Sequence, residues 1–258
     1  MIKYIQLIIV LMALGSLKGQ EYKVPFNTGT IVIANMDDVI IEGYTGSEII
    51  ISTDDFDHGD DPDRAAGLKL VNSLGLEDNT GIGLSVEEND GKMVISAISN
   101  SCGESLYKLQ IPKNLNVEYS HRANSGERFY AKDIEGEIVV STNYCDVKLK
   151  DVTGPLSIKS VYGSVDVHFS KVSQVNAISL YSVYDFVDVS IPSDSKVSVD
   201  VKTPYGGIYT DVEIATKSDH KGDYNSINSK SLYGDINGGG VSMNVKSGYE
   251  NVYLRKNK

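Results

Sequence analysis

The sequence predicts an all-β protein, a single-stranded parallel β-helix (β-solenoid) with a short helix in its N-terminal part. Three observations predict this fold. The octapeptide SVYGSVDV at Ser160–Val167 returns as SVYDFVDV at Ser182–Val189. Related stretches recur at a spacing of roughly 20 residues, which is typical of solenoids. The composition of 24 Gly, 16 Tyr, 6 Pro and no Trp indicates many short strands and turns.

The repeat has the pattern Ser or Thr, any residue, Tyr, two residues, then Val or Ile. The six copies are Thr142–Leu149, Ser160–Val167, Ser182–Val189, Thr203–Thr210, Ser231–Gly238 and Ser247–Leu254. A degenerate seventh copy lies at Ala123–Arg128, because IPKNLNV and IPSDSKV each reach a Gly fifteen residues after their Ile. Ser125 replaces Tyr in this copy, and a register slip of one residue would bring Phe129 inward in place of Arg128.

Each repeat unit alternates inward Val, Ile or Leu with outward polar residues, so it cannot bury its apolar side alone. Parallel stacking of successive units pairs their backbones and builds one apolar core. We expect the solenoid to be right-handed, as parallel crossovers usually are. Gly163, Gly206 and Gly234 follow Tyr at a corner where we expect positive φ.

The N-terminal part has a different texture. Residues 1–19 are expected to be a signal peptide, because the apolar run is too short to span a membrane; an uncleaved tether is the alternative. Residues 20–105 are expected to form a β-rich cap and residues 106–258 the solenoid. The cap contains strands within 30–53, a short helix from Pro62 with Ala65, Leu68 and Leu70 on its apolar face, and a hairpin turning at Asn89–Gly91.

The net negative charge of the chain limits the classes of partner that it is expected to bind. The formal net charge is −11, and loss of Lys3 and Lys18 with the signal peptide would lower it to −13. This argues against nucleic acid and anionic membrane surfaces, which favour basic proteins. No second long apolar segment follows, so no membrane span is expected after cleavage. We expect an exported protein that is periplasmic, cell-surface or secreted. Pairing through an open last rung, Glu250–Arg255, would produce a dimer.

Each of two candidate sites has a purely structural alternative. Cys102 and Cys145 would form a disulfide in an oxidising compartment, or remain two small buried thiols. An acidic cluster could hold Ca²⁺ weakly, or be a solvated loop. Its residues are Asp54, Asp55, Asp57, Asp60 and Asp61. The four histidines are expected at the surface or in turns, and no other cofactor is indicated.

The repeated tyrosines are the candidate ligand-binding residues. They are Tyr162, Tyr184, Tyr205 and Tyr233. Stacked at equivalent positions they would form a buried ladder that stabilises the fold. Facing outward, they would offer rings to a surface glycan or an envelope protein. Alternation does not decide between the two, because the corner Gly breaks its phase.

The order of TIVIANMDDVIIEGYTGSEIIIS, the DRAAGL insert, YKLQIPKNLNV and the Tyr-Gly repeats resembles the bacterial exported β-strand repeat family of unknown function labelled putative adhesin. The resemblance covers nearly all of the chain after residue 19. It implies a parallel β-solenoid in the cell envelope and brings no catalytic residues. We therefore expect a non-enzymatic adhesin or envelope-interaction surface. The alternatives are a carbohydrate-active β-helix enzyme and a structural or sensory envelope accessory.

Overall fold

The computed structural model describes residues 20–34, 36–53, 64, 67–98, 105–122, 126–217 and 230–257. They form an all-β protein with two mixed sheets and no helix element. The ten-stranded sheet contains, in order, β1 (Gln20–Pro25), β4 (Glu48–Thr53), β7 (Leu106–Pro112), β3 (Asp38–Tyr44), β9 (Arg128–Lys132), β11 (Asp146–Val152), β13 (Val165–Phe169), β15 (Val187–Ile191), β21 (Val252–Lys256) and β17 (Ile208–Thr210). The eleven-stranded sheet contains β18 (Ala215–Thr216), β19 (Lys230–Ile236), β16 (Val197–Thr203), β20 (Val241–Ser247), β14 (Ile178–Ser182), β12 (Leu156–Ser160), β10 (Ile138–Thr142), β8 (Asn116–His121), β2 (Thr30–Ala34), β6 (Lys92–Ala97) and β5 (Leu84–Asn89).

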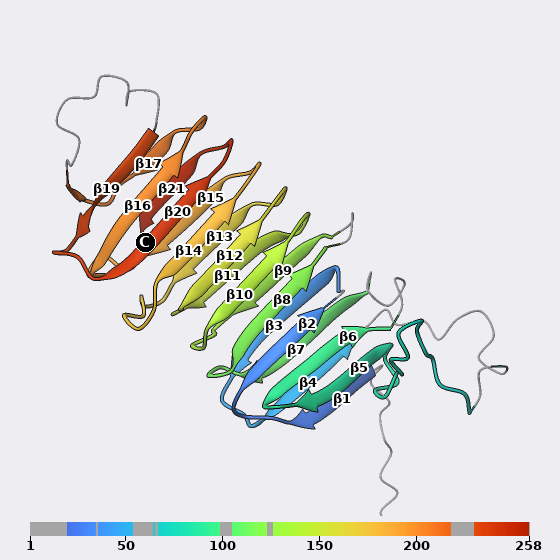
Figure 1. Ribbon diagram of the computed structural model, residues 1–258. Coiled ribbons are helices and arrows are strands. Elements are labelled where there is room, and N and C mark those ends of the chain that lie inside the picture. The colour runs from blue at the N-terminus through green and yellow to red at the C-terminus, as the bar shows by residue number, and fades with distance from the viewer. Residues whose placement is uncertain are drawn as a thin grey trace, which may run out of the picture.

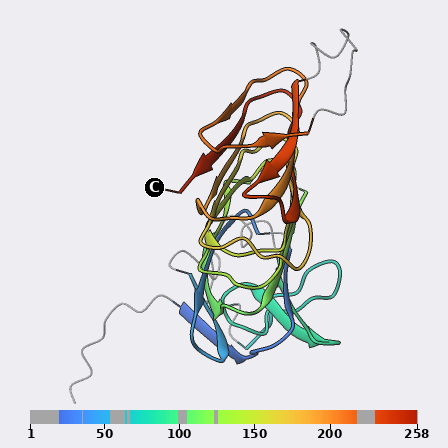
Figure 2. The same ribbon diagram turned by 90° about the vertical axis from the view of Figure 1, so that its left-hand side faces the viewer.

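From β6 to β18 the chain alternates strand by strand between the two sheets, which face each other across the core in an elongated stack (Figures 1 and 2). We call a strand of the eleven-stranded sheet together with the next strand of the ten-stranded sheet a rung. Neighbouring rungs pair in parallel throughout the middle of the stack. Antiparallel strands lie at both ends, with β1, β4 and β5 at one and β18 and β19 at the other.

Burial alternates along the strands as the repeat predicts. In β13, Val165, Val167 and Phe169 are buried while Asp166 and His168 are partly exposed. Inward Val, Ile and Leu side chains from both sheets form one hydrophobic cluster from Phe26 to Leu254. Removing this apolar surface from water is the main favourable term for a fold whose strands have few local contacts.

The rungs do not stack in chain order. Rung β20–β21 lies between β14–β15 and β16–β17, as the red strands among the orange ones show in Figure 1. Rung β2–β3 likewise lies between β6–β7 and β8–β9. The prediction of an open last rung at Glu250–Arg255 is therefore wrong, because β21 is paired on both sides.

Two other local predictions can be checked. Phe129 is buried and pairs in register with Val147, so the one-residue slip is confirmed and Arg128 points outward to Asp38. The turn of the β5–β6 hairpin is also confirmed, with φ of 50° at Asp90 and 74° at Gly91.

The predicted short helix is not borne out among the described residues. Leu68 and Leu70, expected on its apolar face, lie in a non-helical segment, and Leu68 is 75% exposed. A helix this short is stable only when its apolar face packs against a neighbouring element, and the exposed Leu68 side chain does not pack in this way. Ala65 and Pro62 lie outside the described residues, as do residues 1–19 with the expected signal peptide. No helix in the described part of the chain is long and apolar enough to cross a membrane.

Candidate functional site

A column of buried hydroxyls explains the Ser or Thr that opens each repeat. Ser182 ends β14, accepts a hydrogen bond from the backbone N–H of Asp185 at 3.1 Å, and donates one to the carbonyl of Gly163 in the preceding rung at 2.8 Å. Five rungs share the first bond, and four share the second. The hydroxyls belong to Thr142, Ser160, Ser182, Ser247 and Thr203. They satisfy backbone groups that the corner would otherwise leave buried and unpaired.

Glycine after the corner tyrosine is required by close approach, and the prediction of positive φ is wrong. A Cβ at Gly163 would lie 2.1 Å from the carbonyl oxygen of Cys145, and one at Gly206 would lie 2.0 Å from that of Glu250. Neither glycine has positive φ. At these two positions the backbones of adjacent rungs meet with no room for a side chain, whereas Cys145, Asp185 and Glu250 carry one at the same position of their rungs.

The corner tyrosines form an outward ladder. The ring centroids of neighbouring members are 4.8 Å apart for Tyr144–Tyr162, 4.9 Å for Tyr162–Tyr184, 4.9 Å for Tyr184–Tyr249 and 5.1 Å for Tyr249–Tyr205. The interplanar angles are 7° to 17°, so the rings are stacked. Exposure runs from 39% for Tyr144 to 70% for Tyr205. We call these five residues the tyrosine ladder.

Stacking limits which atoms of the ladder a ligand can contact. Each interior ring has both faces covered by its neighbours, so its edge and hydroxyl are what solvent and a ligand can reach. The two predicted alternatives therefore combine: the rings stack as in a structural ladder, and they do so on the surface.

Tyr233 is not part of the ladder. It lies on β19, which pairs antiparallel with β16, and its ring lies 5.6 Å from the Nζ of Lys217. Because a strand running the opposite way does not repeat the corner, the matching sequence SLYGDING is not a structural copy. Tyr144 and Tyr249 take part instead.

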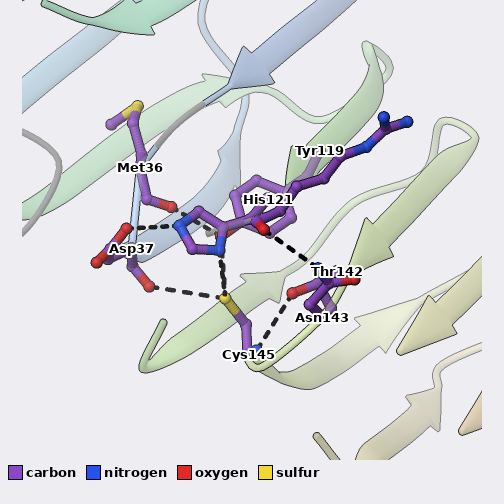
Figure 3. Close-up of polar contacts among 8 residues, drawn as sticks. Met36, Asp37, Tyr119, His121, Thr142, Asn143 and Cys145 are labelled. Carbon is purple, nitrogen blue, oxygen red and sulfur yellow. Dashed lines mark hydrogen bonds and ion pairs between the residues drawn. The ribbon is translucent and has the colours of Figure 1, made fainter. Parts of the chain in front are cut away.

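A buried polar cluster replaces the ladder at the next corner (Figure 3). The Nε2 of His121 lies 2.5 Å from Oδ1 of Asp37, and its Nδ1 lies 3.6 Å from Sγ of Cys145. Tyr119 donates its hydroxyl hydrogen to the carbonyl of Met36 at 2.7 Å, and its oxygen lies 3.3 Å from the same sulfur. The contributing segments are the β2–β3 connection, β8 and the turn after β10, so the cluster joins three neighbouring rungs.

The cluster shifts the titration of its members. The hydrogen bond with Cys145 and then that with Asp37 raise the pKa of His121 above its ordinary value, although burial opposes them. Burial raises the pKa of Cys145, but hydrogen bonds with His121, Thr142 and Tyr119 outweigh it, so the thiol pKa is lowered. Burial raises the pKa of Tyr119. The order nucleophile, base and carboxylate resembles a catalytic arrangement, but Cys145 and His121 are 0% and 1% exposed. We interpret the cluster as structural: its hydrogen bonds connect three neighbouring rungs.

The other predicted site residues have separate outcomes. Cys145 is a free buried thiol whose sulfur contacts His121 and Tyr119 in the cluster. Cys102 lies outside the described residues, so the disulfide between the two stays a prediction. The acidic loop, Asp54 to Asp61, also lies outside them, and the Ca²⁺ suggestion stays a prediction. Within the described ranges, no group of three or more His, Cys, Asp or Glu is arranged to hold a metal ion. The surface prediction is wrong for His121, which is buried.

Comparison with known proteins finds two distant structural neighbours and no matching family. No protein-family model matches the chain, and no curated protein matches it. A crystal structure of a putative cell adhesion protein from Clostridium sporogenes aligns with 93% of this chain and 100% of its own, at 12% identity and a TM-score of 0.45. That of a putative adhesin from Bacteroides fragilis aligns with 94% and 98%, at 11% identity and a TM-score of 0.34. Likeness at these values supports no argument about what this chain does.

Proposed function

We propose that this protein is an exported, non-enzymatic β-solenoid that presents a surface for adhesion or for contacts within the cell envelope, with the tyrosine ladder as its contact strip. The solenoid interpretation is supported by the alternation of the chain between two sheets and by the parallel pairing of adjacent rungs. Export rests on the signal-like segment at residues 1–19.

The outward ladder is the observation that carries the proposal. Stacking alone does not require exposure, since the same rings would add more stability if buried. Here every member keeps at least 39% of its surface exposed. Tyrosine is enriched at protein interfaces because it combines apolar area with a hydrogen-bonding hydroxyl at low entropy cost. The strip offers a row of hydroxyls carried by rings that stack on one another.

The test is a binding screen of residues 20–258 against surface glycans and envelope proteins. A triple variant, Tyr162→Phe with Tyr184→Phe and Tyr249→Phe, keeps the stack and removes three hydroxyls. Tyr130→Phe, at a partly buried tyrosine on the outer face of β9, is the matched control.

The triple variant should lose binding at an unchanged melting temperature, and the control should bind like the wild type. Binding to no member of either class, or binding that is the same in the triple variant, would overturn the proposal. Turnover of a glycan by the purified protein would favour the enzymatic alternative instead.

A further inference from the structure

A row of lysines runs beside the tyrosine ladder. The residue before the corner Ser or Thr points outward from the eleven-stranded sheet, and it is Lys in three rungs, Tyr in one and Ser141 in the fifth. In spatial order these residues are Lys159, Tyr181, Lys246 and Lys202, each in register with the next. The three lysines are exposed. Three rungs therefore carry the same sequence, Lys, Ser or Thr, any residue, Tyr.

The charges in this row are poorly compensated. Among the described residues, Lys159 and Lys246 have no ion pair, and the Nζ of Lys246 lies 4.9 Å from the ring centroid of Tyr181. Lys202 contacts Asp200 at 2.7 Å. Lys246 and Lys202 are direct register partners, and like charges at such positions destabilise a sheet.

Some other cations of this acidic chain have partners across the rungs. Lys92 pairs with Glu118 at 3.0 Å, and Arg255 pairs with Asp188 at 2.8 Å. The formal net charge of the chain is −11, so a row that gathers three lysines, two of them without an ion pair among the described residues, is not a consequence of composition. A bound anion would remove the repulsion within the row.

The two rows are close and parallel. In each of the three rungs that carry a lysine, the lysine and the ladder tyrosine are three residues apart, so their Cα atoms lie within about 10 Å of each other. The ladder has four steps of 4.8 to 5.1 Å, so the strip is about 20 Å long. Lys230 adds a cation at the far end, where its Nζ donates to the carbonyl of Tyr205 at 3.3 Å.

We propose that this strip binds an acidic polysaccharide along its length, with carboxylates on the lysines and sugar hydroxyls on the tyrosine hydroxyls. The inference deepens the proposed function and rests on it. A narrow strip that presents lysine ammonium groups beside tyrosine hydroxyls matches an extended polymer that carries both carboxylates and hydroxyls. Asp185 and Glu250 directly follow ladder tyrosines in the chain, whereas the lysines precede them, so a broad anionic surface such as a bilayer would meet repulsion from these carboxylates.

The experiment measures binding of residues 20–258 to polygalacturonate, with neutral dextran beside it. The variant is Lys159→Glu with Lys246→Glu. The control is Lys150→Glu with Lys171→Glu, which changes the net charge equally at two exposed lysines away from the strip.

The wild type should bind polygalacturonate more tightly than dextran, and less tightly as salt increases. The strip variant should bind it about five- to thirtyfold more weakly, and the control should bind as the wild type does. Thermal melting of both variants checks that they fold.

Equal weakening in the two variants would show a general charge effect and overturn the inference. So would preference for dextran, or tighter binding to DNA or anionic vesicles than to polygalacturonate. Dextran binding that is lost in the triple Tyr→Phe variant would leave the proposed function intact while the inference fails. Absence of binding to any glycan or envelope protein would defeat both.

Discussion

Replacement of Tyr184 by Ala tests whether the ladder stabilises the fold through stacking. Tyr184 stacks on two rings, Tyr162 and Tyr249, whereas Tyr144 at the end of the ladder stacks on Tyr162 alone among the described residues. Their exposures are similar, 45% and 39%. Each side chain therefore removes a similar apolar area from water, about 100 Å², worth about 2.5 kcal/mol of unfolding free energy.

The second stacking partner should make the difference between the two variants. An aromatic pair adds about 0.5–1.5 kcal/mol beyond its area, so Tyr184→Ala should lower the free energy of unfolding by that much more than Tyr144→Ala. Urea denaturation followed by circular dichroism measures both, and Tyr184→Phe should stay close to the wild type because it keeps both stacks. Equal losses in the two Ala variants would refute the stacking argument.

Three further outcomes are expected. Ser182→Ala should lower the unfolding free energy, measured by the same urea denaturation, by about 2–4 kcal/mol because it leaves a buried N–H and a buried carbonyl unpaired. Ser179→Ala, on the exposed face of β14, should cost under about 0.5 kcal/mol. The pKa of His121 is raised, so the stability contributed by its charged form is present below its unfolded pKa, about 6.5, and is lost as the pH rises through the higher folded pKa. Asp37→Asn should therefore cost about 1.5–3 kcal/mol near pH 6 and less near pH 9, and a loss that does not vary with pH would contradict this sign. Truncation after Gly240 removes β20 and β21, so limited proteolysis should cut the rungs on both sides of the gap, and a protease-resistant truncated chain would show that the rung order is different.

The repeat predicts the rungs because each of its positions has one physical task. Inward Val and Ile give the core, and the Ser or Thr hydroxyl pairs the corner backbone. The sequence does not predict the order of the rungs. Val187 and Val252, which are stacked, hold the same repeat position as Val165 and Ile208, so any two rungs are compatible neighbours and loop lengths alone do not exclude intercalation.

The repeat also predicts one part of the candidate site, the tyrosine ladder, but not the buried polar cluster. The ladder follows from repetition, although Tyr233 shows that a matching sequence can occupy an antiparallel strand. The polar cluster brings together Asp37, His121 and Cys145, which are 84 and 24 residues apart in the two contacts, and no short motif joins them. One signal was present: Tyr119 and His121 alternate with outward residues in β8, which places both on the inner face.

Intercalation of the last rung also determines whether the proposed strip is continuous. Tyr249 lies between Tyr184 and Tyr205, and Lys246 lies between Tyr181 and Lys202. Before β20 and β21 pair, the tyrosine that precedes the gap has no stacking partner on that side, and the lysine row lacks its central charge. Because the strip and the core of this rung form together, binding through the ladder should require a docked C-terminal rung. A ligand that bridges the gap should therefore stabilise the docked state, by an amount set by its affinity and concentration.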